Sequence, residues 1–271
     1  MSSRAATFTA EVVRRERLCD RLIRLVLGGP GLAEFTSTGI PDEWVALVVP
    51  GQFQSRYYTV RSWADGELVL DVVVHRVGLV TEWASRSDIV GETVQVSEPK
   101  GSFDLPTGAG WLYLVGDLTA LPAMARISES VAPELEVRIW AEAPEPLPDY
   151  VGRRQLDPHA EPTWLAPPAG GGSGLAAQVE TIDFPDEPGY FWMAGESAQM
   201  RAIRKHLMRV VRLPSHAYDV MGYWRGVAAR QPRAVDPGPI YRAGKAAGLS
   251  DEQIWQRYDE AQGEQARQEQ Q

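Results

Sequence analysis

The sequence predicts two folded parts, an antiparallel six-stranded barrel followed by an α/β domain. Three observations support this prediction. Residues 1 to about 104 contain short runs typical of β-strands, separated by Gly, Pro, Asp and Ser clusters. After the turn-forming segment 106–110, compact apolar runs alternate with helical patterns, which is typical of a parallel sheet covered by helices. The length of 271 residues is sufficient for two hydrophobic cores.

In the first part, the clearest strand lies around residues 68–75, where Leu68, Leu70 and Val72 alternate with their neighbours as expected for a strand with one buried face. The same reasoning gives six expected strands: Phe8–Val13, Leu22–Leu27, Trp44–Val49, Arg56–Trp63, Glu67–Val77 and Glu92–Val96.

In the second part, the run WLYLVG at 111–116 has the composition of a buried parallel strand. We then expect a helix over 121–131, strands over 136–140, 162–165, 190–194 and 217–223, and a second helix over 197–211. Proline- and glycine-rich segments at 143–149 and 167–174 are expected to be loops. A capping-box pattern at 250–253 predicts a helical tail. The predicted boundaries are 1–108 for the barrel, 109–226 for the α/β domain and 227–271 for a helical extension.

Composition excludes several functional classes. There are 27 basic and 36 acidic residues, a formal charge of −9, so we expect neither a nucleic-acid partner nor a membrane partner. The single cysteine, Cys19, cannot form an internal disulfide, and no Cys/His spacing indicates a metal site. The N-terminus lacks an apolar signal region and no apolar run is long enough to cross a membrane. We therefore expect a cytoplasmic protein.

The most informative segment of the barrel is Arg56-Tyr57-Tyr58-Thr59-Val60-Arg61. Alternation places Arg56, Tyr58 and Val60 on one face of the strand and the other three residues on the opposite face. Alone, this pattern fits an ordinary aromatic strand, because aromatic and β-branched residues are common in strands. Two further barrel segments carry polar and glycine residues: 71–84, with His75, Gly78 and Thr81, and the turn 98–103, with Lys100-Gly101-Ser102.

The α/β part has three comparable segments. Gly116-Asp117-Leu118-Thr119-Ala120 follows a buried strand and enters a helix, an arrangement that lets a nucleotide approach backbone amides, although a GxGxxG pattern is absent. Ala194-Gly195-Glu196 repeats this arrangement one unit later, and here an acidic residue at a helix start is also favoured by the helix dipole alone. Gly222-Tyr223-Trp224-Arg225 ends the last expected strand.

Together these segments resemble the siderophore-interacting protein family, the FAD-dependent ferric-siderophore reductases of the ferredoxin-reductase-like superfamily. The resemblance covers most of residues 8–226 and is strongest at 115–123. It implies a flavin-binding barrel followed by a Rossmann-like NAD(P)-binding domain. Leu79, Val80, Glu98 and Lys100 depart from the family's usual residues.

By this resemblance, Arg56 holds a phosphate of FAD, Tyr58 stacks on the isoalloxazine and Thr59 hydrogen-bonds near N5. Tyr58 and Thr59 are thus the expected catalytic residues. Further cofactor contacts are expected at Val73, Val74, His75, Gly78, Val80, Thr81, Trp83, Lys100, Gly101, Ser102, Gly116, Asp117, Thr119, Ala120, Gly195 and Glu196. Structural roles remain open for His75 as a turn residue, for the turn at 99–103, and for Trp224 as a packing residue.

The implied activity is NAD(P)H-dependent reduction of ferric siderophores, with release of Fe(II) during iron acquisition. NADH and NADPH both remain possible donors, since Glu142 favours a ribose hydroxyl whereas Arg153 and Arg154 favour a 2′-phosphate. A positive mouth containing Arg61, Lys100 and Arg225 is expected to receive the ferric siderophore. The alternatives are a flavin reductase acting on free flavin, a ferredoxin or a quinone, a ferredoxin as electron donor, and a non-catalytic siderophore-binding protein.

Overall fold

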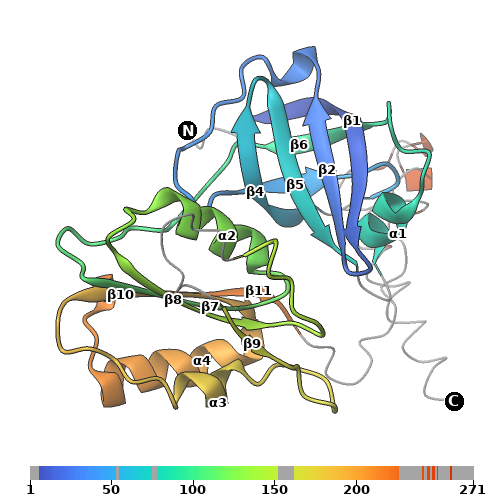
Figure 1. The fold of residues 1–271 in the computed structure, drawn as a ribbon. Coiled ribbons are helices and arrows are strands. Elements are labelled where there is room, and N and C mark those ends of the chain that lie inside the picture. The colour runs from blue at the N-terminus through green and yellow to red at the C-terminus, as the bar shows by residue number, and fades with distance from the viewer. Residues whose placement is uncertain are drawn as a thin grey trace, which may run out of the picture.

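The computed structural model describes residues 6–52, 55–74, 78–151 and 162–225, together with a few positions between 240 and 257. The predictions for His75, Arg153 and Arg154, and almost all of the helical tail predicted after residue 226, lie outside these residues. The expected fold class is confirmed: a closed antiparallel barrel precedes a parallel-sheet α/β domain (Figure 1). No helix in the described part of the chain is both long and apolar enough to cross a membrane.

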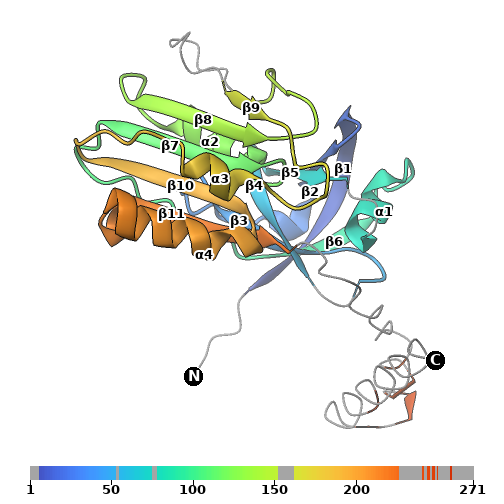
Figure 2. The ribbon, with the colours of Figure 1, turned by 90° about the horizontal axis from the view of Figure 1, so that it is seen from below.

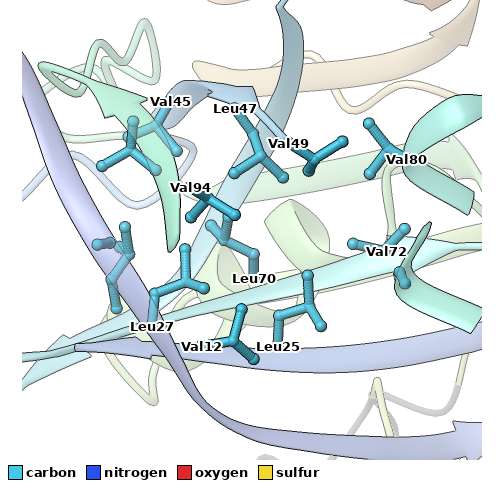
Figure 3. Packing of buried hydrophobic residues seen from close by; sticks show 14 of the residues in the cluster. Val12, Leu25, Leu27, Val45, Leu47, Val49, Leu70, Val72, Val80 and Val94 are labelled. Carbon is cyan, nitrogen blue, oxygen red and sulfur yellow. The ribbon is translucent and has the colours of Figure 1, made fainter. Parts of the chain in front are cut away.

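The barrel closes in the strand order β1-β2-β5-β4-β3-β6, and all of its pairings are antiparallel. Its strands are β1 (Thr7–Cys19), β2 (Leu22–Gly28), β3 (Trp44–Val48), β4 (Arg56–Ala64), β5 (Glu67–Val73) and β6 (Thr93–Ser97). Apolar and polar side chains alternate along these strands. This favours a barrel, because every second side chain points into a shared interior. Figure 3 shows this core, where Leu25, Leu47 and Leu70 from three strands point toward one another and are fully buried. Helix α1 (Leu79–Ser85) adds Val80 to it.

The α/β domain contains a five-stranded parallel sheet in the order β11-β10-β7-β8-β9. The strands are β7 (Trp111–Asp117), β8 (Glu136–Glu142), β9 (Thr163–Leu165), β10 (Gly189–Glu196) and β11 (Tyr218–Trp224). The central strands β7 and β10 are buried throughout, because both faces of the sheet are covered by helices.

Helix α2 (Leu121–Ser130) lies between the sheet and the barrel, while α3 (Leu175–Val179) and α4 (Ser197–His206) cover the opposite face (Figures 1 and 2). The two faces of β7 follow this division: Leu112 and Leu114 pack with α2, whereas Trp111 and Tyr113 join the core under α3 and α4. Helix α2 contacts both β4 and β7, so it connects the two domains.

Three elements differ from the prediction. Strand β1 continues past Val13 to Cys19. Residues 14–17 are charged and none of them is buried, so they carry no alternating apolar pattern, and this part of the strand pairs with β2. Helix α4 ends at His206 and a π-helical turn, Leu207–Val211, completes it before Arg212 takes a left-handed conformation at φ 65°. Helix α3 was not predicted, since its five residues directly follow the glycine-rich loop. Short 3-10 turns occupy Pro30–Leu32 and Ser215–Ala217.

Candidate functional site

Strand β4 places its three predicted flavin-binding residues in three environments. Arg56 is exposed, donates a hydrogen bond to the carbonyl of Ser55 at 3.1 Å, and forms no salt bridge with any residue that the structure describes. Tyr58 is half-buried against the barrel core, and this burial raises the pKa of its phenol to about 12. Thr59 is buried. The strand therefore offers an unpaired guanidinium, a neutral phenol and a hydroxyl within four consecutive residues.

The two faces of β4 serve different neighbours, as the alternation predicts. Val60 is fully buried in the barrel core, and Tyr58 packs against the same core. On the other face, Tyr57 is 71% exposed, whereas Thr59 lies beside Tyr223 of the α/β domain. Burial raises the pKa of the Tyr223 phenol well above its ordinary value. The outer face of β4 thus runs from solvent at Tyr57 into the domain interface at Thr59.

Most of the described side chains of α1 and of the loop before it contact residues of the barrel. Gly78 caps the helix with φ at +155°, a conformation that side-chain-bearing residues rarely adopt. The Thr81 hydroxyl donates to the carbonyl of Val73 at 3.3 Å, and the Trp83 indole donates to Glu92 at 2.7 Å. Val80 and Trp83 are buried members of the barrel core. These two side chains are therefore enclosed by protein, and the cofactor contacts expected at Val80 and Trp83 stay predictions.

The turn after β6 connects the two domains. Lys100 is exposed, and its backbone exchanges hydrogen bonds with Trp44 at 2.6 and 3.0 Å. Gly101 does not require a positive φ: a Cβ there would lie 2.6 Å from the Ile40 side chain, so close packing explains the glycine. The Ser102 hydroxyl lies 3.0 Å from Asp42 and 2.6 Å from Asp219. For Gly101 and Ser102, these contacts favour the structural interpretation over cofactor contact.

The glycine segments of the α/β domain meet at one edge of the sheet. Parallel pairing sets Gly116 of β7 opposite Ala194 of β10, and Gly195 opposite Gly222 of β11. Carboxyl edges of parallel strands are where open α/β sheets bind ligands. Gly116 itself serves packing, because a Cβ there would lie 2.5 Å from Ala120 and would prevent α2 from approaching the strand.

Three carboxylates are buried at this edge, one at the end of each of β7, β8 and β10. They are Asp117, Glu142 and Glu196. Asp117 accepts hydrogen bonds from the Thr119 amide at 2.9 Å, the Thr119 hydroxyl at 2.6 Å and the Trp224 indole at 2.5 Å. Burial nevertheless dominates and raises the pKa of Asp117 above its usual range. The hydroxyl of Thr119 is therefore occupied by its own turn.

Glu142 does not present a free carboxylate. Its Oε2 accepts a hydrogen bond from the Gly174 amide at 2.7 Å, and the Ser173 hydroxyl bonds to it as well. Burial raises the pKa of Glu142, and the nearby Asp117 and Glu196 add to the shift. Glu142 thus anchors the glycine-rich loop 167–174 beside the sheet edge, and its expected preference for a ribose hydroxyl stays a prediction.

Two charged residues of α2 contact the barrel. Arg126 donates to the carbonyl of Val60 at 2.7 Å and lies 2.9 Å from Glu43. Glu129 forms a bidentate pair with Arg61 at 2.8 and 2.6 Å. This pair compensates the charge of Arg61, and the expected place of Arg61 in a positive mouth stays a prediction.

Lys100 and Arg225 are exposed and form no salt bridge with any of the described residues. They remain the two candidate cations for an anionic substrate. The structure gives no contact that joins them into one patch.

Two further carboxylates at the domain interface could not be predicted from the sequence. Asp42 is fully buried and accepts hydrogen bonds from the Ser102 and Phe103 amides at 2.9 and 3.0 Å, and from the Trp192 indole at 3.2 Å. Asp71 of β5 accepts from Arg24 at 2.8 Å through both oxygens and from the Tyr150 phenol of the α/β domain. Asp42 lies outside the motif segments, and Asp71 begins the segment 71–84 without an expected role of its own. The sequence could not predict their contacts, because their partners are distant in the sequence.

A shallow hollow of about 450 Å³ lies elsewhere, lined by residues 105–110, 132, 134 and 135 that precede β7 and β8. It is therefore at the amino edge of the sheet, where parallel strands do not usually bind ligands. Among the described residues, no group of three or more His, Cys, Asp or Glu side chains is placed to hold a metal ion.

The residues of β4 fit a flat, phosphate-bearing cofactor. An unpaired guanidinium suits a phosphate, and a partly exposed phenol ring suits an aromatic ring system. The carboxyl edge of the sheet, with its helix-entering glycine segments, suits a second nucleotide. Helix α2 joins these two places, since it follows Ala120 and contacts β4.

Comparisons with known proteins agree with this arrangement. The siderophore-interacting protein family model matches residues 109–226, and the siderophore-interacting FAD-binding domain model matches residues 51–103. An NADPH-dependent ferric-chelate reductase of Escherichia coli is 26% identical over 243 residues, covering 79% of this chain and 91% of that protein. The ferric vibriobactin reductase of Vibrio cholerae is 28% identical over 179 residues, covering 63% and 64%. A siderophore utilization protein from T. fusca aligns in structure with a TM-score of 0.69 and 26% identity, covering 85% and 97%.

Proposed function

Because this chain belongs to the siderophore-interacting protein family, we propose that it is an NAD(P)H-dependent FAD enzyme that reduces ferric siderophores and releases Fe(II). The observation that carries the proposal is the position of α2, which joins the glycine segment 116–120 of the sheet edge to the polar strand β4. A two-site redox enzyme needs this proximity, since its two cofactors must meet.

The residues of β4 would hold FAD. The exposed guanidinium of Arg56 would bind a phosphate as a bidentate donor. Tyr58 would cover the ring with its half-buried phenol, which its raised pKa keeps neutral, and Thr59 would offer a hydroxyl at the domain interface. When bound, FAD supplies the step between a two-electron hydride donor and one-electron acceptors.

The sheet edge would hold the nicotinamide nucleotide. Gly116–Ala120 and Gly195-Glu196 would bound it, because they end the adjacent strands β7 and β10. Buried Asp117 and Glu142 are held by groups of the protein, so they shape this edge rather than remain free for a ligand. One NAD(P)H supplies two electrons and so reduces two ferric complexes to Fe(II), with release of one proton. Reduction frees the iron because oxygen ligands hold the divalent ion more weakly.

An anaerobic titration tests the proposal. Purified protein loaded with FAD is mixed with NADH or with NADPH, and the flavin absorbance is followed in a stopped-flow instrument. Ferric siderophore is then added, and Fe(II) is trapped with a chromogenic chelator. We expect bleaching by at least one nucleotide, followed by reoxidation that yields two Fe(II) per nucleotide consumed.

Each alternative gives a different result in the same titration. Failure to retain FAD would indicate a non-catalytic siderophore-binding protein. Bleaching without reoxidation by any ferric siderophore, but with reoxidation by free flavin or a quinone, would indicate a reductase with another acceptor. Absence of bleaching by both nucleotides would contradict the proposed donor.

A further inference from the structure

We propose that Arg126 of α2 is a positioning residue that fixes the separation between the flavin strand β4 and the nicotinamide segment 116–120. The inference rests on the proposed function and adds a residue that neither motif contains. Arg126 is largely buried at the domain interface, and its side chain is 17% exposed. It touches neither β7 nor the motif residues Arg56, Tyr58 and Thr59 in any contact that the structure gives.

The barrel end of the connection is a forked contact. Arg126 Nη1 donates to the Val60 carbonyl at 2.7 Å, and Nη2 lies 2.9 Å from Glu43 Oε1. Val60 is the residue after Thr59, so the contact fixes the backbone of β4 directly beside the proposed catalytic hydroxyl. Glu43 is itself held, because Ser37 and Thr38 donate to its carboxylate at 2.5 to 2.7 Å. Its own carbonyl accepts from the Val60 amide at 2.8 Å.

The other end of the connection is the helix. Ala120 precedes α2, and Arg126 lies six residues further along, about 9 Å at a rise of 1.5 Å per residue. The first turn is packed tightly against the sheet, since a Cβ at Gly116 would lie 2.6 Å from Met124. A movement of Arg126 relative to Val60 is therefore also a movement of β4 relative to the segment 116–120.

A second pair fixes the orientation. Glu129 lies three residues after Arg126, so both face the barrel, and it binds Arg61 through two oxygens. The two pairs have opposite polarity: α2 provides the cation in one and the anion in the other. A rotation or slide of α2 along β4 would bring like charges together. We call these four residues, Arg61, Glu129, Arg126 and Glu43, the α2 clasp.

Hydride transfer is sensitive to such geometry. Reacting atoms must approach within about 3–3.5 Å, and a misplacement of about 1 Å can slow a reaction roughly 100-fold. Lysine at position 126 would retain the charge but lose the fork, so it could not contact Val60 and Glu43 in the same way. Arg126→Lys should consequently disturb the separation between β4 and the segment 116–120 while leaving FAD binding to β4 intact.

The test compares Arg126→Lys with the control Arg138→Lys. Arg138 pairs with Glu136 within the α/β domain, so the control changes an arginine pair that does not cross the interface. For the FAD-loaded proteins, we would measure FAD affinity, the rate of flavin reduction at saturating nucleotide, and reoxidation by ferric EDTA. We expect Arg126→Lys to slow reduction by about 10- to 100-fold, with FAD affinity and reoxidation unchanged, and Arg138→Lys to match the wild type.

Hydrogen–deuterium exchange without nucleotide provides a readout independent of turnover. Amides of β4 and α2 should exchange faster in Arg126→Lys, while those of β2 and β10 should not. Glu129→Gln removes the second pair of the α2 clasp at a more exposed position, so it provides a second test should the lysine variant fold poorly; we expect a smaller slowing of reduction.

Equal reduction rates in the wild type and both clasp variants would overturn the inference and leave the proposed function standing. Loss of FAD in proportion to the loss of reduction would also overturn it, because the residue would then be merely structural. A wild-type protein that neither nucleotide reduces would instead contradict the proposed function, and the inference with it.

Discussion

Buried carboxylates lie both at the barrel side of the domain interface and at the sheet edge, but their environments shift their pKa values in opposite directions. At Glu43, burial opposes ionisation, yet hydrogen bonds from Ser37 and Thr38 and the charge of Arg126 outweigh it and lower the pKa. At Asp117, burial prevails over the hydrogen bonds from Thr119 and Trp224, and the pKa is raised. Burial alone does not determine the charge of a carboxylate, because hydrogen bonds and a facing cation can together outweigh it.

The two candidate binding places, strand β4 and the carboxyl edge of the sheet, also differ in the charges that they offer to a ligand. The barrel strand keeps its cation Arg56 exposed and without a described salt bridge, ready for an anionic group. The sheet edge instead gathers three buried carboxylates and no described basic partner for any of them. A phosphate is favoured by the first arrangement and disfavoured by the second. The backbone and shape of the edge, rather than its charge, would therefore receive a nucleotide.

The largest expected effect is on the barrel side. Arg56→Ala should weaken FAD binding by about 1.5–3 kcal/mol, roughly 10- to 150-fold, because a charge-assisted contact to phosphate is lost. Fluorescence titration of the apoprotein with FAD measures the change. Arg14→Ala, on β1 and paired with Glu67, is the matched control and should bind FAD as the wild type does. An Arg56→Ala protein with undiminished affinity would remove the basis of the flavin-site assignment.

The second effect tests the sheet edge. Gly195 has φ at +158°, and a Cβ there would lie 2.7 Å from Asp117 Oδ2. Gly195→Ala should lower the free energy of unfolding by about 1–3 kcal/mol through backbone strain and crowding. Urea denaturation measures it. Gly170→Ala is the control, because a Cβ at Gly170 meets nothing within 4 Å. Equal stability of the two variants would mean that the edge is less tightly packed than described.

The third prediction concerns the pH dependence of the free energy of unfolding, to which Glu43 and Asp117 should contribute in opposite directions. Glu43 has a lowered pKa, so its contribution to stability is present above the unfolded value near 4.5 and is lost as the pH falls through the folded pKa. Asp117 has a raised pKa, so the folded state loses stability as the pH rises from 3.8 through the folded pKa.

The free energy of unfolding that Glu43→Gln loses relative to the wild type should therefore increase as the pH rises toward 4.5. The corresponding loss in Asp117→Asn should decrease as the pH rises above 3.8. Urea denaturation of both variants and the wild type between pH values of about 3.5 and 7 measures the two trends. If both deficits change in the same direction, the opposite charge environments of the two carboxylates are not as the structure indicates.

The smallest effect concerns the substrate. If Arg225 attracts an anionic ferric siderophore, reoxidation of the reduced flavin should slow as salt rises, since the Debye length falls from about 10 Å at 0.1 M to about 3 Å at 1 M. We expect a weaker salt dependence in Arg225→Gln, and the wild-type dependence in Arg201→Gln, which changes an exposed arginine of α4. A rate that salt leaves unchanged in all three would indicate a neutral or cationic acceptor.

The sequence was sufficient for the fold class because the barrel strands alternate and the sheet strands are apolar throughout. It was insufficient at the domain interface. Asp42 and Glu43 lie at the turn directly before β3, where there is no periodic pattern, and the residue that Asp42 holds, Trp192, is 150 positions away. The pairing of Arg61 could not be predicted for the same reason, since Glu129 faces it from another domain. Local patterns predict elements, whereas interface charges depend on how the elements are finally placed.

The glycines show the same limit of prediction from sequence. A sequence marks Gly101 and Gly116 as positions without a side chain but does not say why. The structure assigns both to close packing, against Ile40 and against Ala120. The position of the three glycine segments at one edge of the sheet follows from the pattern, because parallel strands bring their carboxyl ends to the same edge.

Closure of the barrel has a consequence for association with other chains. Since β1 pairs with β6, each of the six barrel strands has two neighbours, and none is the outer strand of an open sheet. Among the described strands, β9 and β11 are outer strands, each with a neighbour on one side only. β9 is three residues long, a short template for strand addition. If this protein aggregates by edge-to-edge pairing, β11 is the strand where that pairing is expected to begin.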